Sequence, residues 1–407
     1  MRYWWTLGLA TIILLALAAI PPASTRAVAT FTVESTLVGP GTNDSNTADN
    51  VCDNGSGVCT FRAAIQQANA TPGQDTIDFN IPGSDPGCSG LTGVCTIFVD
   101  SLWPAITDSV ILNGTTQPGW AGAPLIELYG GNAGLNADGL RITGGNSTVK
   151  GLAINRFGGD GIELSIAGGN TIVQNFIGTD PTGLVTDPVP ASSGDELGNL
   201  GHGVYVNGTA GNTIGGSNGP EAACADASDD DGDGFVNDGC PQVGSFSETG
   251  VDCQDAADAP DEDPGNPVTD DDAVVNDGCL ARGLGNIISG SGRKDNNFHS
   301  HGVYILGAGA TGNNVLGNFI GIDFKGSAAG NSNFDGNNGS GVTIDNASGN
   351  TIGSTDATSR NYISLNNDEG VWINAANAST NIVQGNYIGT DYTGAVDRGL
   401  CPARAEE

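Results

Sequence analysis

The stretch Asn170-Thr-Ile-Val-Gln-Asn-Phe-Ile-Gly-Thr-Asp180 decides the fold, because close copies of it return later in the chain. One copy runs from Asn313 to Asp323, and another runs from Asn381 to Asp391. All three contain Asn, four residues, Asn, an aromatic residue, Ile, Gly, any residue and Asp. A motif that recurs at related positions indicates a repeat architecture, in which each unit packs on its neighbours.

Short apolar segments with a two-residue period accompany these copies, and Gly, Pro or Asn bounds each one, which is typical of strands. Predicted strands in the first part of the chain are residues 30–38, 77–81, 96–99, 110–112, 125–129, 139–142, 149–154 and 161–164. Gly139-Leu and Gly161-Ile stand in the same phase 22 residues apart, which fits one coil of three short strands. Stacked coils let each strand bond to its equivalents at about 4.8 Å. We therefore expect an all-β fold, a single-stranded right-handed parallel β-helix, or solenoid.

Equivalent residues stack along the axis of such a solenoid. Ladders of side-chain amides are expected at Asn175, Asn318 and Asn386. Stacking inside the core is expected for Ile177, Ile320 and Ile388. The aspartates at the end of the motif recur beside Gly, so they are predicted to cap turns and not to act as catalytic carboxylates. They are Asp180, Asp323 and Asp391.

Residues 60–69 are predicted to form a short helix, because Thr60 can cap it and Pro72-Gly73 ends it. Its predicted apolar face consists of Phe61, Ala64, Ile65 and Ala68. A helix with one apolar face can cover the first coil and its unpaired strand edge.

Two family resemblances follow from these residues. Residues 31–83 resemble the CSLREP-type N-terminal domain of secreted bacterial proteins, and the match includes Cys59, Arg62, Ala64 and Ile65. The chain departs from that motif at Thr60, Phe61 and Ala63, where Ser, Leu and Glu would be expected. From about Ile97 onward, residues 146–157 and the three motif copies resemble right-handed parallel β-helix repeat proteins. This second resemblance implies the fold and specifies activity poorly.

The chain is predicted to begin with a secretory signal peptide, residues 1–29, with Arg2, an apolar run and an Ala-x-Ala site. An N-terminal membrane anchor is the alternative interpretation. No later stretch is apolar enough to span a membrane, so we expect a secreted, extracellular or cell-surface protein. The expected parts are a capping region (30–95), coils (96–216), an insertion (217–284), coils (285–400) and a tail (401–407).

The insertion is located by comparing two coils. Asn350 precedes Asn361 by 11 positions, whereas Asn212 precedes the equivalent Asn286 by 74, which is 63 more. A solenoid tolerates such a corner loop, since the entropy of loop closure grows slowly with length. Residues 221–280 contain 18 Asp or Glu and no Lys or Arg.

The first half of the insertion has the alternating oxygen ligands of a calcium loop, with a Gly for the sharp turn. The predicted ligands are Asp229, Asp231, Asp233, Phe235 through its carbonyl, Asn237 and Asp238. It resembles the calcium loops of thrombospondin type 3 repeats more than an EF-hand, because Cys240 stands where the EF-hand Glu would be. A solvated acidic loop is the alternative. Calcium is the expected cofactor.

Cysteine spacing predicts disulfides, which export permits. The short-range pairs are Cys52–Cys59 and Cys88–Cys95. In the insertion an internal duplication favours Cys224–Cys240 and Cys253–Cys279, although four cysteines allow three connectivities. Cys401 is left over.

The charge balance narrows the class of partner. The net charge is −33, from 46 acidic and 13 basic residues, so we expect no nucleic-acid partner, because proteins that bind nucleic acid need basic stripes. A saline or calcium-rich exterior suits such a surface, since cations screen and bind carboxylates.

The sequence contains no recognisable set of acid and base residues, so no catalytic residue is predicted. His202 echoes a His motif of pectin hydrolases, but the Asn-Thr-Asp and Arg-x-Lys motifs of those enzymes are absent. The position of His202 recurs in other coils, and its residue type varies there, which indicates a corner of the coil. The equivalent residues are Asp160, His301, Ser340 and Glu369. A modest basic cluster is expected at Arg141, Lys150 and Arg156. Sugar rings could stack on Trp120 and Trp372, although a packed or turn-covering role is commoner.

Two functions remain. We expect a non-catalytic binding, adhesive or structural role towards polysaccharide or a cell-surface component, with a calcium-ordered insert. The alternative is a polysaccharide lyase or glycoside hydrolase of the pectin-lyase-like type. The chain ends where earlier copies continue into another coil, so we expect an exposed edge there and a truncated gene product.

Overall fold

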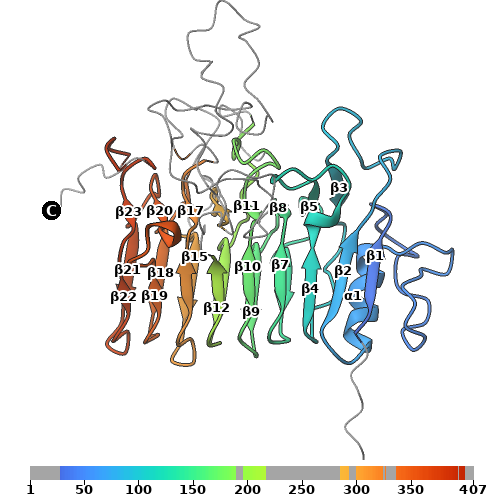
Figure 1. Cartoon of the computed structure of the whole chain (residues 1–407), viewed down its shortest axis with the longest axis horizontal. Helices are drawn as coiled ribbons and strands as arrows, with labels where there is room; N and C mark the ends of the chain where they lie inside the picture. Colours follow the sequence, from blue (N-terminus) through green and yellow to red (C-terminus); the bar gives the residue numbers. More distant parts are fainter. Residues whose placement is uncertain are drawn as a thin grey trace, which may run out of the picture.

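A computed structural model describes residues 28–188, 196–216, 285–292, 299–323, 326, 336–392 and 394–398. These residues wind into stacked coils, which lie side by side from β1 at one end to β23 at the other (Figure 1). Three sheets run along the stack, and neighbouring strands within them pair in parallel. The predicted all-β parallel β-helix is therefore confirmed.

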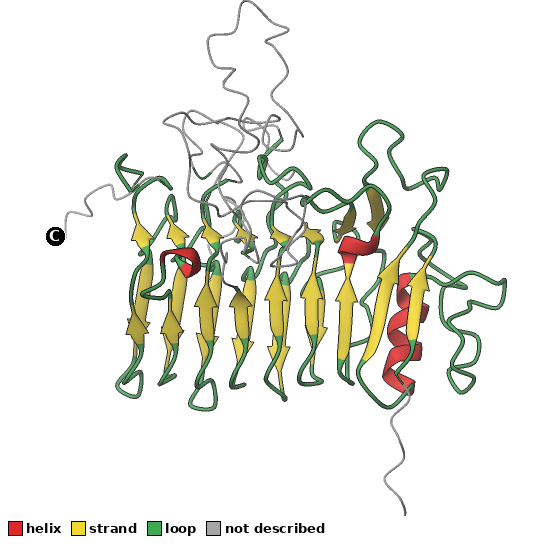
Figure 2. Cartoon of the chain, viewed as in Figure 1, coloured by secondary structure: helices red, strands yellow, loops and turns green. Residues whose placement is uncertain are grey.

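Each sheet takes one strand from successive coils (Figure 2). Sheet 1 contains β1 (Thr30–Val33), β2 (Asp75–Phe79), β4 (Val110–Asn113), β7 (Thr148–Lys150), β10 (Thr171–Val173), β13 (Thr213–Gly215), β16 (Asn314–Leu316), β19 (Thr351–Ile352) and β22 (Ile382–Val383). Sheet 2 contains β3 (Cys95–Phe98), β5 (Ile126–Tyr129), β8 (Leu152–Asn155), β11 (Phe176–Ile177), β14 (Ile287–Ile288), β17 (Phe319–Ile320), β20 (Tyr362–Ile363) and β23 (Tyr387–Ile388). Sheet 3 contains β6 (Leu140–Ile142), β9 (Ile162–Ser165), β12 (Val204–Asn207), β15 (Val303–Leu306), β18 (Val342–Asp345) and β21 (Val371–Asn374).

The coil from β6 to β9 shows how the chain builds the repeat. It visits sheets 3, 1 and 2 in turn and then returns to sheet 3, where Leu140 pairs with Ile162. This register confirms the predicted coil length. One expectation is wrong, because residues 149–154 belong to two strands and not to one. Gly151 turns the corner between them with φ of +73°, a left-handed conformation that glycine adopts without a Cβ clash.

The interior is a continuous apolar column. Ile177 and Ile320 are fully buried in it, as predicted. Ile388 is 45% exposed, since β23 is the last strand of sheet 2 among the described residues, and the expected exposed edge is present there. Full burial of such a side chain contributes about 1.5–3 kcal/mol, so coils stabilise one another chiefly through this stacking.

Two asparagine ladders run beside the column and confirm the predicted amide stacking. The first ladder contains Asn170, Asn212, Asn313, Asn350 and Asn381. The second contains Asn175, Asn286, Asn318, Asn361 and Asn386. In each step the side-chain amide and the backbone N–H of one rung donate to the side-chain oxygen of the next. Buried amides thereby remain hydrogen-bonded, which avoids the cost of burying a polar group without a partner.

The ladders also show between which two sheets the predicted insertion is located. Asn212 and Asn350 are rungs of the first ladder, and Asn286 and Asn361 are rungs of the second. The long connection therefore joins the same two sheets as the 11-residue one. The insertion itself, with its predicted calcium ligands and its four cysteines, lies outside the described residues, as do Cys401 and the predicted signal region up to residue 27.

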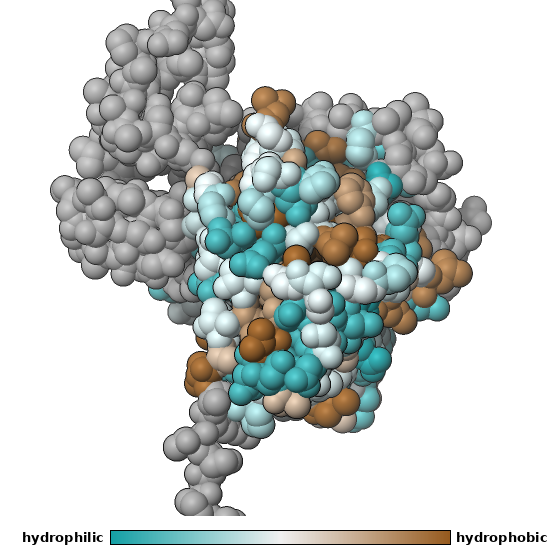
Figure 3. All heavy atoms as spheres, turned by 90° about the vertical axis from the view of Figure 1, so that its right-hand side faces the viewer, coloured by the Kyte–Doolittle hydropathy of each residue, from teal (hydrophilic) through white to brown (hydrophobic). Residues whose placement is uncertain are grey.

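The predicted helix is α1 (Phe61–Ala70), and it lies at the N-terminal end of the stack against β1 and β2 (Figure 1). The hydroxyl of Thr60 caps it by accepting from the backbone N–H of Ala63 at 3.2 Å. Its predicted apolar face is buried. Figure 3 looks onto this end, where brown surfaces form separate patches among teal and white ones. No helix among the described residues is long and apolar enough to cross a membrane.

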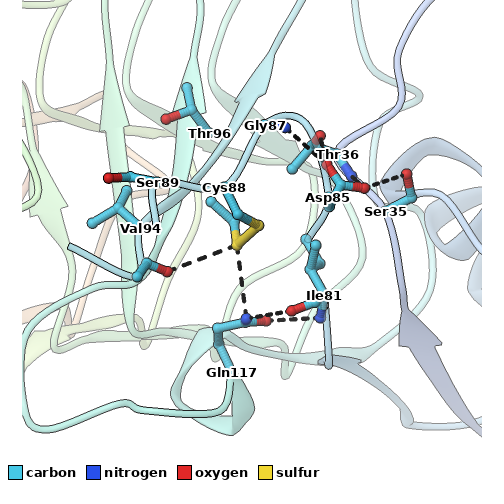
Figure 4. The surroundings of a disulfide bond; sticks show 12 residues. Ser35, Thr36, Ile81, Asp85, Gly87, Cys88, Ser89, Val94, Thr96 and Gln117 are labelled. Atoms are coloured by element: carbon cyan, nitrogen blue, oxygen red, sulfur yellow. Dashed lines mark hydrogen bonds between the residues drawn. A yellow bond between two sulfur atoms is a disulfide. The ribbon is translucent and has the colours of Figure 1, made fainter. Parts of the chain in front are cut away.

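Both short-range disulfides are present, Cys52–Cys59 and Cys88–Cys95. The surroundings of the second bridge are held by side chains from other coils (Figure 4). Gln117 bonds to the backbone N–H and carbonyl of Ile81 and to the sulfur of Cys95. Asp85 accepts from the hydroxyls of Ser35 and Thr36. The bridge therefore closes the loop before β3 onto the first residue of β3, and the hydrogen bonds of Asp85 and Gln117 fasten the region to neighbouring segments.

Candidate functional site

The outward face of sheet 3 presents one aligned row of side chains, here called the outer row. The strand register places its members in successive coils: Arg141, Glu163, Tyr205, Tyr304, Thr343 and Trp372. Their neighbours on each strand, such as Ile162 and Leu164, are buried in the core. Because side chains alternate along a strand, the row points away from the core, at a spacing of about 4.8 Å per coil.

Aromatic rings dominate the middle and end of the outer row. Tyr205 and Tyr304 stack with their ring centres 5.5 Å apart and their planes inclined by 13°. Trp372 is 40% exposed at the far end. Aromatic rings with hydroxyl groups at their tips suit ligands that are partly apolar and partly polar.

A second set of side chains, the corner row, borders the outer row just before each strand of sheet 3. It contains Asp138, Asp160, His202, His301, Ser340 and Glu369. Nearly every member accepts the backbone N–H of the next member. Asp160 Oδ1 accepts from His202 at 2.6 Å, and His202 Nδ1 accepts from His301 at 2.9 Å. The row therefore closes the corners of the coils.

This geometry confirms that His202 is a corner residue. A backbone N–H can only donate, so Nδ1 of His202 is an acceptor and the ring proton is on Nε2. Burial, together with neighbouring His301, lowers the pKa of His202 to about 3. The two imidazoles stack with centres 5.3 Å apart. Since its free lone pair is already in use, His202 is not placed to act as a general base.

Three carboxylates gather where the two rows meet in the first coils of sheet 3. Burial raises the pKa of Asp138 to about 6, and neighbouring Glu163 adds to the rise. Burial raises the pKa of Asp160 to about 7, helped by Asp138 and Glu163. Glu163 itself forms an ion pair with Nε of Arg141 at 3.0 Å and accepts from Asn207 at 3.3 Å. One guanidinium thus faces three acidic groups.

The tyrosines of the outer row keep their protons. Burial and Asp345 raise the pKa of Tyr304 to about 12, and its hydroxyl donates to Asp345 at 3.2 Å. Burial, Asp160 and Glu163 raise the pKa of Tyr205. Both hydroxyls are therefore neutral hydrogen-bonding groups at physiological pH.

Two hydroxyls on this face have no hydrogen-bond partner within the described part of the chain. Thr343 Oγ1 lies in the outer row between Tyr304 and Trp372, and its residue is 1% exposed. Ser165 Oγ is one outward position further along β9, and its residue is 6% exposed. Buried polar groups normally have a partner, so each of these hydroxyls offers an unfilled position.

The structure separates the predicted basic cluster and places one of the two predicted tryptophans in the outer row. Arg141 lies on sheet 3, Lys150 on sheet 1 and Arg156 follows β8 of sheet 2, so the expected basic cluster is wrong. The three lie close in sequence but point from different sides of the solenoid. Of the tryptophans, Trp372 lies in the outer row, while Trp120 lies in the connection between β4 and β5.

The turn-capping role of the motif aspartates is confirmed at two positions. Asp180 Oδ1 accepts from the backbone N–H groups of Leu184 and Val185 at 3.1 and 3.0 Å. Asp391 Oδ1 accepts from Val396 at 3.3 Å. Across the ranges that the structure covers, no group of three or more His, Cys, Asp and Glu side chains is arranged to hold a metal ion.

Sequence reasoning missed Glu163, Tyr205 and Tyr304 as site residues. A signal was present: Gly, an aliphatic residue, a variable residue and an aliphatic residue recur in six coils. The copies begin at Gly139, Gly161, Gly203, Gly302, Gly341 and Gly370. Aligning the third position of these copies yields the outer row from Arg141 to Trp372.

Comparisons with known proteins identify no family for this chain and no activity. No protein-family model matches the chain, and no curated protein matches it, so the CSLREP resemblance stays a prediction. One similar solved structure is the Dettilon tailspike protein, with 12% identity and a TM-score of 0.36 over 89% of this chain; the match spans about half (51%) of the tailspike chain. Another is an alginate lyase from Paenibacillus sp. str. FPU-7, with 15% identity and a TM-score of 0.31 over 88% of this chain and 98% of the lyase. Values this low support no argument about function.

Proposed function

We propose that the protein is secreted or attached to the cell surface and binds a polysaccharide along the outer row, without catalysis. The observation that carries this proposal is the stacked pair Tyr205–Tyr304 followed by the exposed Trp372 in one straight row. Sugar rings pack their C–H faces on such aromatics, while hydroxyl groups of the same sugars reach polar neighbours. A row that repeats once per coil matches a ligand that repeats along its own length.

Two features support a non-catalytic role in an exported protein. The disulfides Cys52–Cys59 and Cys88–Cys95 are typical of oxidising compartments. His202 and His301 use Nδ1 to hold the backbone of the next coil, so the imidazoles serve the fold.

A glycoside hydrolase is the second candidate, and one observation favours it. Asp160, with its pKa raised to about 7, lies near Glu163, which is ion-paired with Arg141. Glycosidases use a protonated carboxyl group and an ionised one in the same site.

One experiment separates the two candidates. Oligosaccharides of several classes are titrated into the protein in a calorimeter, and the same mixtures are assayed for new reducing ends. Binding without new reducing ends supports the proposal, whereas steady release that Asp160→Asn abolishes supports the hydrolase.

The role of the outer row is tested with matched aromatic variants. Trp372→Ala should weaken binding by about 5–30-fold, since truncating an aromatic anchor costs about 1–2 kcal/mol or more. Phe98→Ala is the control, because Phe98 is 51% exposed on sheet 2. Equal effects of the two variants would place the binding site elsewhere.

We also propose that calcium orders the insertion at residues 217–284. The support is the spacing of its carboxylates and its Gly turn.

A further inference from the structure

Five acidic side chains lie along the face that the outer and corner rows share. The acidic residues of this face are Asp138, Asp160, Glu163, Asp345 and Glu369. Arg141 is the one Lys or Arg in the two rows, and its Nε is 3.0 Å from Glu163. At the rim, His299 Nδ1 lies 2.7 Å from Asp368. The face therefore carries more negative than positive charge.

The first three carboxylates, Asp138, Asp160 and Glu163, have one guanidinium near them, and Nε of that group is paired with Glu163. Burial and mutual repulsion hold the pKa values of Asp138 and Asp160 well above the usual range for aspartate. Their oxygens accept the backbone N–H groups of Asp160 and His202, and these bonds do not offset the burial. A cation arriving from solution would stabilise the ionised forms.

The same face also contains a hydroxyl group and aromatic rings, which are side chains that contact sugars in proteins. The Thr343 hydroxyl, which has no partner among the described residues, is buried between Tyr304 and Trp372 in the outer row. A ligand hydroxyl or amine would satisfy it once a small shift of these side chains uncovers it. The exposed ring of Trp372 attracts cations to its face as well as apolar C–H groups. Acidic groups and rings in one row favour a ligand that combines a sugar ring with a positive charge.

We propose that the outer row binds a polysaccharide whose sugars carry free amino groups, and that it repels polymers of uronic acids. This inference rests on the proposed function and names its ligand class. A uronate chain would bring its carboxylates against Glu163, Asp345 and Glu369, a repulsion that Arg141 alone does not offset. An amino-bearing chain places ammonium groups beside those carboxylates and its ring faces on Tyr205, Tyr304 and Trp372.

The test uses four soluble probes of similar length in calorimetric titrations of the full chain. They are chitosan oligosaccharides with free amines, their N-acetylated counterparts, neutral cello-oligosaccharides and alginate oligosaccharides. We expect the free-amine probe to bind at least tenfold more tightly than the N-acetylated one, with affinity falling as salt rises.

Charge variants locate the contact. Asp345→Asn and Glu369→Gln should each weaken binding of the free-amine probe by about 3–10-fold, which corresponds to about 0.7–1.4 kcal/mol. Asp356→Asn, exposed in the connection between β19 of sheet 1 and β20 of sheet 2, is the matched control and should leave affinity unchanged. An equal loss with Asp356→Asn would overturn the inference, because it would indicate general attraction of a polycation to an acidic protein.

The remaining outcomes separate this inference from the proposed function. Equal affinity for free-amine and N-acetylated probes, or binding of alginate that Trp372→Ala removes, would overturn the ligand class and leave the polysaccharide function standing. No binding by any of the four probes would overturn both.

Discussion

Asp160→Asn is the variant that most directly tests the electrostatics of the candidate site. The two side chains have the same shape, so the backbone N–H of His202 keeps an oxygen acceptor at the position that Asp160 Oδ1 holds at 2.6 Å. The substitution removes the ability to ionise and replaces the second carboxyl oxygen with an amide NH2 group. It therefore isolates the cost of placing a negative charge beside Asp138 and Glu163 in a buried corner.

The expected magnitude follows from the pKa of Asp160. Its carboxyl group titrates near 3.8 when unperturbed and near 7 in the folded protein, where burial and the two neighbouring carboxylates raise the pKa. The folded state holds the proton more tightly, so ionisation costs stability progressively as pH rises from about 4 to about 7. At about 1.36 kcal/mol per pKa unit the full cost is about 4 kcal/mol. Asp160→Asn should be nearly neutral at pH 4 and stabilising by about 2–4 kcal/mol at pH 8.

Urea unfolding of both proteins at pH 4, 6 and 8 measures this difference. Histidines also titrate in this range: folding lowers the pKa of His202 and His301, so their contribution to stability is lost as pH falls below about 6.5. Both proteins contain them, so the contribution cancels in the comparison. Asp356→Asn is the matched control, because exposed Asp356 also accepts a backbone N–H, from Thr358 in η3 (Ala357–Ser359).

The reasoning is refuted if the stability difference between Asp160→Asn and the parent protein is the same at pH 4 and pH 8. A difference of the opposite sign, with the parent more stable at pH 8, would mean that the carboxylate has a cationic partner in the folded state. A pH-dependent gain of similar size in Asp356→Asn would show that removing any negative charge from this acidic protein is enough.

Three further predictions concern the ladders, the corners and the insertion. Asn318→Ala removes three hydrogen bonds to neighbouring rungs of the second ladder and one to the carbonyl of Ile214, and it should cost about 3–5 kcal/mol in urea unfolding. Asn386→Ala removes three hydrogen bonds at the half-buried end of the ladder and should cost about half as much, since water there can replace lost partners; equal costs would contradict the ladder argument. Gly151→Ala should cost about 1–3 kcal/mol by the same measurement, because φ is +73° and a Cβ there would meet Thr115; an unchanged midpoint would contradict it. Calcium should release heat on binding to the full chain, and the double variant Asp231→Asn/Asp233→Asn should abolish that heat; an undiminished signal would exclude the predicted loop.

The sequence by itself determined the repeat and therefore the fold. A strand in a stacked coil meets the same kind of residue above and below, so each position repeats its chemistry along the chain. Asn175, Asn318 and Asn386 were identifiable as one ladder for this reason, and the comparison of Asn212 with Asn350 located the insertion. The sequence also predicted the helix that the structure places at residues 61–70, because capping and apolar spacing are local properties.

Only the tertiary structure decided where the candidate site lies. Glu163, Tyr205 and Trp372 come from coils far apart in sequence, and outward positions of a solenoid vary freely because no core packing constrains them. Proximity in sequence was misleading for the basic residues. Arg141, Lys150 and Arg156 are near neighbours along the chain, yet the corners of one coil place Arg141 on sheet 3, Lys150 on sheet 1 and Arg156 just after a strand of sheet 2. The repeating inward residues determine the fold, whereas the face that a ligand meets depends on which coils lie side by side.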